Sequence, residues 1–324
     1  MFNVNQLKNN IKLSDYTTFK IGGLAKYFFI AKNEDDFVDA IKWAVKNGEK
    51  FFILGCGSNV LFSDLGFDGL VIKMENKNRS IIIKSSDKAI IEVSGNCKLI
   101  DLSRFCLSYS LTGLEWSAGI PGTVGGAIRG NAGAFGSKME DVVKKVKILE
   151  IFQENKKAVR VCSVKKISSK KCKFEYRGSI FKKKKLSIIL SAELALKKCN
   201  KKDIKEKISS YLKSRAGKHP INYPNAGSIF KNVSYENKLN VKKLTDIPEI
   251  FLERKIIPAG WFIEQRGLKG KRIGDAMISK KHANFIVNLG DAKAKDVTDL
   301  IKLVKKEVKK KFKVELEEEL VVVD

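Results

Sequence analysis

The run GIPGTVGGAIRGNAGAFG, residues 119–136, is unusually dense in glycine. Inside regular structure each glycine costs about 0.5–1 kcal/mol relative to alanine, so such a run requires backbone that bends sharply or approaches something closely. The glycines fall three apart twice, at Gly119, Gly122 and Gly125 and again at Gly130, Gly133 and Gly136. Without helix formers, this spacing predicts extended backbone against a flat or elongated ligand, with Asn131 as a polar contact. A tightly packed loop between sheets is the alternative.

A second glycine-rich segment, ILGCGSN, begins at Ile53 directly after an apolar run. Loops of this kind point several backbone N–H groups the same way and so bind phosphate oxygens. The segment is not G-x-G-x-x-G followed by a helix, so the Rossmann dinucleotide fingerprint is absent. By itself it resembles an ordinary hairpin. Two such segments, each flanked by strand-like runs, favour a large phosphorylated cofactor.

Ser228 is the candidate hydroxyl group, in the stretch PNAGSIFKN. A serine after a flexible Ala-Gly pair could donate a proton or hold an anion. It lacks the G-x-S-x-G nucleophile elbow, and the only histidines that could complete a Ser/His triad are His219 and His282. A serine in a turn is the alternative.

Arg177 and a C-terminal carboxylate are the candidate charged groups. The segment FEYRGSIF alternates, which predicts a strand that turns Tyr176 and Arg177 to opposite faces. An arginine there could bind a carboxylate bidentately. The final stretch VELEEELVVV predicts a last strand with Glu315, Glu317 and Glu319 on one face. A carboxylate near an arginine and a serine could take part in proton transfer. Surface charges on solvated faces are the alternative for both.

The elements that must hold these residues are both helices and strands. YFFIA predicts a strand, Asn33 the N-cap of a helix that ends at Gly48, and FFILG the next strand, which together form a β-α-β unit. Further helices are predicted near residues 99–109, in IKEKISSYLKSR and around residues 297–308. Further strands are predicted in LVIKM, SIIIK, AIIEVSG, VVKKVKILEIF, KAVRVCSV and LSIILSAELAL. The fold class predicted is α+β.

Length and composition limit the classes of protein. A chain of 324 residues with 44% hydrophobic residues is expected to divide into roughly two or three domains. No stretch offers the roughly 20 apolar residues of a membrane span, and the first residues lack the features of a signal peptide, so we expect a cytoplasmic protein. The six cysteines show no CxxC motif and no zinc spacing, which predicts reduced thiols and no metal site.

The formal net charge of +27 raises the question of an anionic partner. The lysines are spread in doublets and quartets, such as residues 182–185, without interleaved aromatic residues. This spread favours solvated lysine-rich faces over a nucleic-acid surface. A polyanion-binding protein is the alternative from a different class; it predicts binding that weakens steeply with salt and needs no cofactor.

In their order along the chain, these motifs resemble the UDP-N-acetylenolpyruvoylglucosamine reductase family. The resemblance runs through YTTFKIGG, ILGCGSN, SAGIPGTVGGAIRGNAGAFG, YRGSIF, PNAGSIFKN, AGWFIEQRGLKG, ISKKHANFIVN and the terminal acidic stretch. It implies an α+β fold: an FAD-binding part of the vanillyl-alcohol-oxidase (PCMH) type in two subdomains, residues 1–68 and 69–210, and a C-terminal α+β substrate-binding domain, residues 211–324. The extreme C-terminus is expected to be able to return to the FAD-binding part.

The family resemblance also implies a reaction. FAD, held without a covalent bond, would be reduced by NADPH and would then reduce enolpyruvyl UDP-N-acetylglucosamine to UDP-N-acetylmuramate, a peptidoglycan precursor. No histidine precedes His219, so histidyl attachment of FAD in the cofactor domains is excluded. We expect a monomer with a small-molecule substrate and no nucleic-acid partner. A flavin oxidase acting on another small substrate is the rival within the same class.

The resemblance assigns roles by position. Ser228 would protonate C2 of the enolate-like intermediate, and Arg177 and Glu319 would stabilise charge at the substrate carboxyl group. The substrate pocket would be lined by Tyr176, Asn232 and His282, with Lys218 near the nucleotide phosphates. The FAD pyrophosphate would lie on Gly55, Gly57, Ser58 and Asn59. The rest of the cofactor would follow Gly119, Gly122, Thr123, Gly125, Gly126 and Ile128.

The chain departs from the family pattern at several positions. Cys56 stands where a third glycine is common, and Val233 where proline is usual. The terminal motif, usually Leu-Glu-Pro-Glu-Val, reads LEEELVVV here. Alignment selects Glu319, while strand alternation keeps Glu317 as an alternative and disfavours Glu318. The short path from YRGSIF to LSIILSAELAL leaves no room for the tyrosine-bearing loop of one branch, which predicts a more open cleft.

Overall fold

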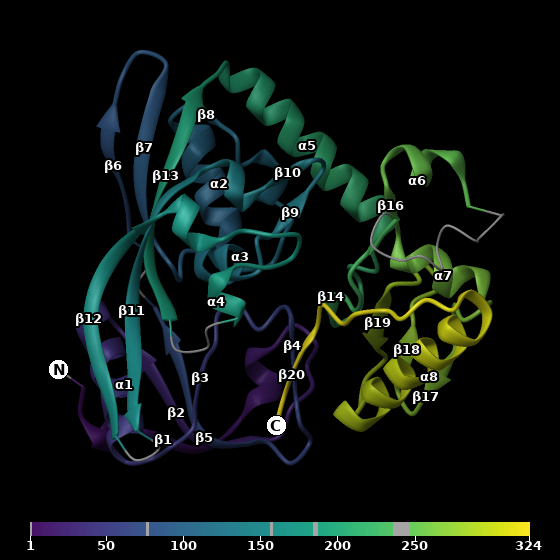
Figure 1. Ribbon diagram of the computed structural model, residues 1–324, viewed down its shortest axis with the longest axis horizontal. Coiled ribbons are helices and arrows are strands. Elements are labelled where there is room, and N and C mark those ends of the chain that lie inside the picture. The colour runs from purple at the N-terminus through teal and green to yellow at the C-terminus, as the bar shows by residue number, and fades with distance from the viewer. Residues whose placement is uncertain (1, 76–77, 156–157, 184–186, 236–246) are drawn as a thin grey trace. The chain divides into compact units, whose positions relative to one another are not determined.

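The computed structural model describes residues 2–75, 78–155, 158–183, 187–235 and 247–324 (Figure 1). The chain forms two compact units. The first contains Met1–Ile11, Ala25–Cys56 and Asp68–Arg215, and the second contains Lys12–Leu24, Gly57–Phe67 and Ala216–Asp324. The second unit therefore takes two short segments from early in the chain. The division at residues 68 and 210 stays a prediction.

The first unit begins with a sheet in the order β1-β2-β5-β3. The side chain of Asn33 accepts a hydrogen bond from the N–H of Asp36 at 2.8 Å, as an N-cap does, and Gly48 follows the helix with φ +67°. The expected strand-helix-strand unit is present, with β5 between β2 and β3 and parallel to β3. The elements are β1 (Lys8–Lys12), β2 (Leu24–Ala31), α1 (Glu34–Lys46), β3 (Phe51–Ile53) and β5 (Phe67–Met74).

The second sheet of this unit runs in the order β12-β11-β13-β7-β6, with β8 added to β13, and its described pairs are antiparallel. Apolar residues of β11 and β13 pack with α1 and β5 in one core, and the same strands share another core with α2 and α3. The strands are β6 (Arg79–Lys84), β7 (Lys88–Ser94), β8 (Leu111–Thr112), β11 (Val143–Asn155), β12 (Ala158–Ser168) and β13 (Ser187–Lys198). The helices are α2 (Leu99–Ser108), α3 (Val124–Arg129) and α4 (Ile180–Lys183), and a small hairpin joins β9 (Gly133–Ala134) to β10 (Ser137–Lys138).

The second unit is built on the antiparallel sheet β14-β19-β18-β17, and helices α7 and α8 share its core. The carboxylate of Asp64 accepts hydrogen bonds from the N–H groups of Ala294 (2.8 Å) and Lys295 (3.0 Å), which ties an early segment to the start of α8. The strands are β4 (Val60–Phe62), β14 (Asn225–Ser228), β15 (Val233–Ser234), β16 (Ile256–Ile257), β17 (Arg272–Ile273), β18 (Ala276–Ile278), β19 (Phe285–Asn288) and β20 (Val321–Val323). The helices are α6 (Glu249–Glu253), α7 (Ala259–Gln265) and α8 (Ala294–Phe312), and α5 (Lys201–Lys218) runs from the first unit into the second.

The last strand is shorter than the sequence predicts. Only Val321–Val323 form β20, which pairs in parallel with β4. Residues 314–320 are extended, with Val314, Leu316 and Leu320 buried and Glu315 and Glu317 exposed. Within this stretch a single bridge joins Glu318 to Phe230. Buried and exposed side chains alternate over residues 314–317, as predicted, but Glu318 and Glu319 are both half-buried. A continuous strand over these residues is wrong, because the described part of the chain offers the segment only this one bridge.

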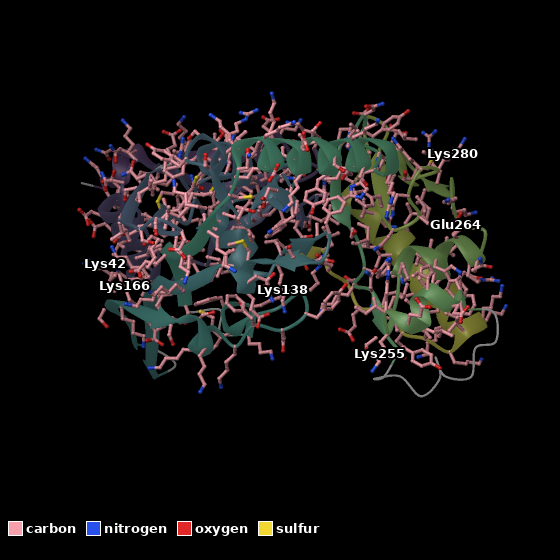
Figure 2. All side chains as sticks on the ribbon, turned by 90° about the horizontal axis from the view of Figure 1, so that it is seen from above. Lys42, Lys138, Lys166, Lys255, Glu264 and Lys280 are labelled. Carbon is pink, nitrogen blue, oxygen red and sulfur yellow. The ribbon has the colours of Figure 1, made fainter. Side chains whose placement is uncertain are left out.

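Lysines lie on the surfaces of both units (Figure 2). Exposed examples are Lys42, Lys138, Lys166, Lys255 and Lys280. The first three form ion pairs with neighbouring carboxylates. Such exposed pairs contribute little to stability.

We expect Asn33→Ala to lower the free energy of unfolding by about 1 kcal/mol, because the first turn of α1 loses its side-chain cap. Asn33→Ser keeps an acceptor at the same place and is the matched control. Urea unfolding followed by circular dichroism measures both variants. An equal loss in the serine variant would contradict the capping explanation.

Candidate active site and cofactor cradle

The loop after β3 presents a run of backbone donors. Among the described residues, no acceptor is found for the N–H groups of residues 55–59. Gly57 has φ +63°, and a Cβ atom there would lie 2.3 Å from the carbonyl oxygen of Tyr16. Its own carbonyl accepts from the N–H of Thr18 at 3.0 Å. Left-handed backbone with successive unbonded N–H groups is the donor set that phosphate oxygens need.

The glycine run 119–136 is not extended throughout, so that expectation is wrong for residues 124–129. They form α3, whose N-cap Thr123 accepts from the N–H of Gly126 at 3.3 Å. The N–H of Gly125 donates to the carbonyl of Gly95 at 2.6 Å, and a Cβ at Gly125 would lie 3.0 Å from that oxygen. Here glycine permits a helix turn to approach another backbone closely.

The two glycine segments meet within the first unit. A Cβ atom on Gly55 would lie 2.8 Å from the Thr123 Oγ1 atom. The Lys73 ammonium group donates to the Gly55 carbonyl at 3.0 Å, and burial lowers the pKa of Lys73. Nothing local in the strand sequence LVIKM marks Lys73, because its contact depends on the pairing of β5 with β3. The N–H groups without acceptors, together with the space at Gly55 that a Cβ atom would occupy, fit the diphosphate of FAD.

The remaining predicted cofactor residues differ in which of their atoms are accessible to a ligand. The carbonyl of Gly122 accepts a hydrogen bond from the N–H of Leu99 at 3.0 Å. A Cβ atom on Gly119 would lie 2.6 Å from the Cδ atom of Arg215. Gly126 is exposed. The Ile128 side chain is fully buried in the core, so only its backbone is placed to contact a cofactor.

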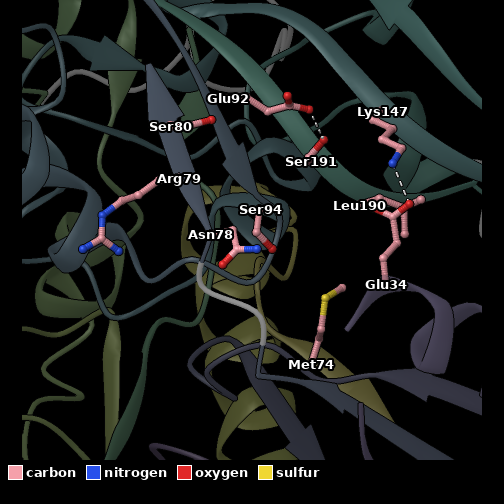
Figure 3. Close-up of a pocket in the computed structure, with 10 residues that line it drawn as sticks. All are labelled: Glu34, Met74, Asn78, Arg79, Ser80, Glu92, Ser94, Lys147, Leu190 and Ser191. Atoms are coloured by element: carbon pink, nitrogen blue, oxygen red, sulfur yellow. Dashed lines mark hydrogen bonds and ion pairs between the residues drawn. The ribbon is translucent and has the colours of Figure 1, made fainter. Parts of the chain in front are cut away.

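A polar pocket of about 420 Å³ also lies in the first unit (Figure 3). Its wall includes Met74, which follows Lys73, and Ser94, which precedes Gly95. Two pairs cross it: Lys147 contacts Glu34 at 2.6 Å, and Ser191 donates to Glu92 at 3.1 Å (Figure 3). The sequence gives no sign of this pocket, because its residues come from separate strands.

Arg177 lies in a turn, not in a strand as predicted. Glu175 and Gly178 exchange two backbone hydrogen bonds of 3.1 Å, and Arg177 between them has φ +54°. Tyr176 is 49% exposed, with the Arg177 guanidinium 5.6 Å from its ring centre. The Arg177 Nη1 atom donates to the carbonyl of Gly133 at 3.0 Å. The turn leaves Tyr176 exposed and Arg177 half-buried, with its Nε atom buried.

Ser228 is the last residue of β14 and pairs with Phe285. The register shifts between Asn225 and Ser228, and Gly227 has φ +77°, as in a bulge that redirects the following side chain. Ser228 is half-buried. Across the described part of the chain, no hydrogen-bond partner is found for its hydroxyl group. That hydroxyl is available to a ligand.

The three C-terminal glutamates, Glu317, Glu318 and Glu319, differ in their contacts with residues 229–231. The N–H of Glu319 donates to the carbonyl of Ile229 at 2.8 Å, which places Glu319 next to Ile229, the residue that follows Ser228. Glu317 lies beside Lys231 and forms an ion pair with it at 3.3 Å, with 64% of its side chain exposed. Glu318 pairs instead with Lys305 of α8 at 3.0 Å.

The predicted substrate residues of the second unit lie around the same sheet. His282 contacts the ring of Phe285, the partner of Ser228, with ring centres 4.7 Å apart. Burial lowers the pKa of His282, and its Nδ1 atom accepts from the N–H of Asn284 at 3.2 Å, so the neutral ring carries its proton on Nε2. Asn232 accepts from the N–H of Ala259 at 3.2 Å. Lys218 is exposed at the end of α5.

The predicted residues therefore fall into two groups. The second unit brings together Gly57, Ser58, Asn59, Lys218, Ser228, Asn232, His282 and Glu319. The Asn59 amide donates to the Glu319 carbonyl at 3.1 Å, and the Thr18 hydroxyl joins the carbonyls of Gly57 (3.3 Å) and Asn225 (2.8 Å). The first unit holds Gly55, Gly119, Gly122, Thr123, Gly125, Gly126, Ile128, Tyr176 and Arg177.

Two family models match the chain. The FAD binding domain matches residues 25–151, and the UDP-N-acetylenolpyruvoylglucosamine reductase C-terminal domain matches residues 219–323. A curated reductase of that name from Caldicellulosiruptor saccharolyticus is 39% identical, covering 98% of this chain and 92% of the relative. Another reductase of that name, from Caldanaerobacter subterraneus, is 38% identical, covering 97% of this chain and 92% of the relative. The chain belongs to the UDP-N-acetylenolpyruvoylglucosamine reductase family.

A solved reductase of this family, from Thermus caldophilus, has the same overall fold. It matches with a TM-score of 0.73 and 30% identity, covering 98% of this chain and 99% of that one. The predicted α+β class, with an FAD-binding part and a C-terminal reductase domain, is confirmed. The cofactor prediction of FAD is confirmed by the matching domain. The roles of individual residues stay predictions.

We expect Gly55→Ala to weaken FAD binding by about 1–3 kcal/mol, the usual cost of an overpacked contact, because the new methyl group would press on Thr123. Gly217→Ala is the matched control, since nothing lies within 4 Å of its Cβ position. Fluorescence titration of the apoprotein with FAD measures both. Equal FAD affinities of the two variants would contradict the placement of the cofactor site at Gly55.

Proposed function

We infer that this chain is an NADPH-dependent flavoenzyme that reduces the enolpyruvyl ether of UDP-N-acetylglucosamine to UDP-N-acetylmuramate, a step of peptidoglycan precursor synthesis. The observation that carries this conclusion is the half-buried Ser228 hydroxyl, which has no partner among the described residues and directly precedes Ile229, the residue that Glu319 contacts, in the domain that matches the family. A hydroxyl donor and a carboxylate on one sheet edge suit addition of a proton next to a carboxyl group.

When bound, FAD would supply hydride chemistry, with NADPH as the electron donor and the vinyl carbon of the substrate as the acceptor. The chain supplies the binding site for this cofactor. The N–H groups of Gly55, Gly57, Ser58 and Asn59 would hold the diphosphate, supported by the absence of acceptors for them in the described chain. Gly119, Gly122, Thr123, Gly125 and Gly126 would line the rest.

Ser228 would deliver the proton to C2 of the substrate. Hydride addition at C3 leaves negative charge on C2 beside the carboxylate, and a proton from the serine hydroxyl completes the lactyl ether. Serine is a weak acid, so this role requires a strongly basic acceptor and a site from which water is excluded. The bulge at Gly227 supports the role, because it sets the direction of the Ser228 side chain.

Arg177 and Glu319 would stabilise the charge that develops at the carboxyl group. A guanidinium group binds a carboxylate through parallel N–H donors, and groups held in place before the reaction stabilise the transition state most. The backbone of Glu319 is fixed by the carbonyl of Ile229 and by the Asn59 amide. That register supports Glu319 over Glu317, which is exposed and paired with Lys231.

Four further side chains would bind the substrate. His282 is neutral and carries its proton on Nε2, so it would donate a hydrogen bond without adding charge. Asn232 and Tyr176 would contribute polar contacts, and the exposed Lys218 would reach the nucleotide phosphates.

A cytoplasmic location and a monomeric state are parts of the same proposal. Five of the six cysteines, namely Cys56, Cys97, Cys106, Cys172 and Cys199, carry free thiols in the structure, and the Cys162 side chain lies outside the described residues. Free thiols are typical of reducing compartments. None of the described helices is long and apolar enough to cross a membrane.

We expect Ser228→Ala to slow oxidation of the reduced enzyme by the enolpyruvyl substrate by about 10²–10⁴-fold, the usual contribution of a general acid. Reduction by NADPH should be unchanged, because no proton from Ser228 is needed in that step. Anaerobic stopped-flow absorption at the flavin band measures the two half-reactions separately. Intact turnover of the enolpyruvyl substrate in this variant would rule out the acid role.

We expect Glu319→Gln to slow the same step by about 10²–10³-fold, as loss of one preorganised charge-stabilising group does. Glu317→Gln makes the same chemical change two residues earlier and is the matched control, expected to leave the step unchanged. Single-turnover kinetics with reduced enzyme compares them. A larger loss in Glu317→Gln would show that the catalytic carboxylate is two residues closer to the N-terminus.

A further inference from the structure

The Asn131 amide is committed to contacts inside the protein. The residue is 3% exposed, with φ +42°. Its Oδ1 atom accepts from the N–H of Glu140 at 3.0 Å. Its Nδ2 atom donates to the Glu140 carboxylate at 3.3 Å and to the carbonyl of Glu175 at 3.1 Å. Both amide protons are used, so the expectation that Asn131 contacts a ligand directly is wrong.

The Glu175 carbonyl belongs to the turn that carries Arg177. Asn131 therefore binds the first residue of that turn from the end of α3, and α3 and α4 lie side by side (Figure 1). Two further hydrogen bonds join the same segments. The Ser179 hydroxyl donates to the carbonyl of Arg129 at 2.7 Å, and the Arg177 Nη1 atom donates to the carbonyl of Gly133 at 3.0 Å. Residues 129–133 and 175–179 are thus clamped together.

The clamp holds backbone that is unfavourable by itself. Arg177 has a left-handed φ value, which residues other than glycine, asparagine and aspartate rarely keep unless the surroundings fix them. Of the clamp's three hydrogen bonds, that of Asn131 is the one donated by a side-chain amide that is almost wholly buried. Because buried donors must be satisfied, the Asn131 amide fixes the turn in one position.

We propose that Asn131 is the positioning residue for Arg177, fixing its guanidinium group relative to the cofactor-binding glycine segment. This inference rests on the proposed function, in which Arg177 binds the substrate carboxyl group. Asn131 acts through the Glu175 carbonyl and does not touch the substrate. Binding of the cofactor and orientation of the catalytic arginine are thereby joined in one continuous segment, residues 119–133.

The test uses Asn131→Asp in the FAD-bound enzyme. Aspartate keeps the size, tolerates left-handed backbone and still accepts from the N–H of Glu140, but it puts a carboxylate oxygen against both the Glu175 carbonyl and the Glu140 carboxylate. We expect oxidation of the reduced enzyme by the enolpyruvyl substrate to slow by about 10²-fold, since a small misplacement of a catalytic group costs that much. Reduction by NADPH should be unchanged.

Asn288→Asp is the matched control. Asn288 is equally buried, and its amide donates to the carbonyl of Phe19 at 3.1 Å in the second unit. The same chemical change there should leave both half-reactions unchanged. An equal slowing of the oxidation step in this control would overturn the proposal, because the effect would then follow from loss of any buried amide.

A double-mutant cycle with Arg177→Ala separates positioning from a general structural role. If Asn131 acts through Arg177, adding Asn131→Asp to Arg177→Ala produces no further loss. A full additional loss, or an equal loss of NADPH-driven reduction, overturns the proposal. Should Asn131→Asp fail to fold, Ser179→Ala takes its place, because it removes the hydrogen bond from Ser179 to Arg129 in the same clamp. The same results would then support or overturn the proposal. A wild-type enzyme that the enolpyruvyl substrate does not reoxidise would instead overturn the proposed function, and this inference with it.

Discussion

The close approach of backbone to backbone at the glycine segments is the constraint on which the first unit depends. The N–H of Gly125 reaches the carbonyl of Gly95 at 2.6 Å, and Gly55 leaves room for the Thr123 side chain. Any larger side chain at either glycine would meet an atom at 3.0 Å or less. This approach joins α3 to the end of β7 and puts the loop after β3 against the α3 N-cap. A diphosphate site that uses backbone donors requires such closeness, since side chains would otherwise separate the donors from the ligand.

The same run continues from cofactor binding into catalysis. After α3 the chain turns through Asn131, whose amide fixes the turn of Arg177. In the second unit, a bulge before Ser228 and the register of the C-terminal segment position the candidate residues. Gly227 precedes Ser228 in a bulge, and the hydrogen bond from the N–H of Glu319 to the carbonyl of Ile229 holds the Glu319 backbone against the residue after Ser228. In both units the catalytic candidates are held by backbone geometry and hydrogen bonds.

Several local features could be predicted because they depend on neighbouring residues alone. The α1 helix begins at its Asn33 cap and is followed by Gly48, as residue preferences at helix ends predict. The long strands of the second sheet follow from their β-branched and alternating residues. The predicted fold class and cofactor came from the order of the motifs. The helix in the glycine run and the turn at Arg177 were not predicted, because each is held by partners far along the chain.

The sequence by itself determined which residue types are available, their alternation along strands and helices, and the family to which the ordered motifs point. Only the tertiary structure decided which of them meet. It placed Glu319 against Ile229 and Glu317 against Lys231, both far back along the chain, and it paired Glu318 with Lys305 of α8. It formed a pocket from strands that are distant in sequence, and it enclosed the Asn131 amide inside the protein. The reason is that hydrogen-bond partners and close backbone contacts depend on how strands pair, and local residue preferences do not specify that pairing.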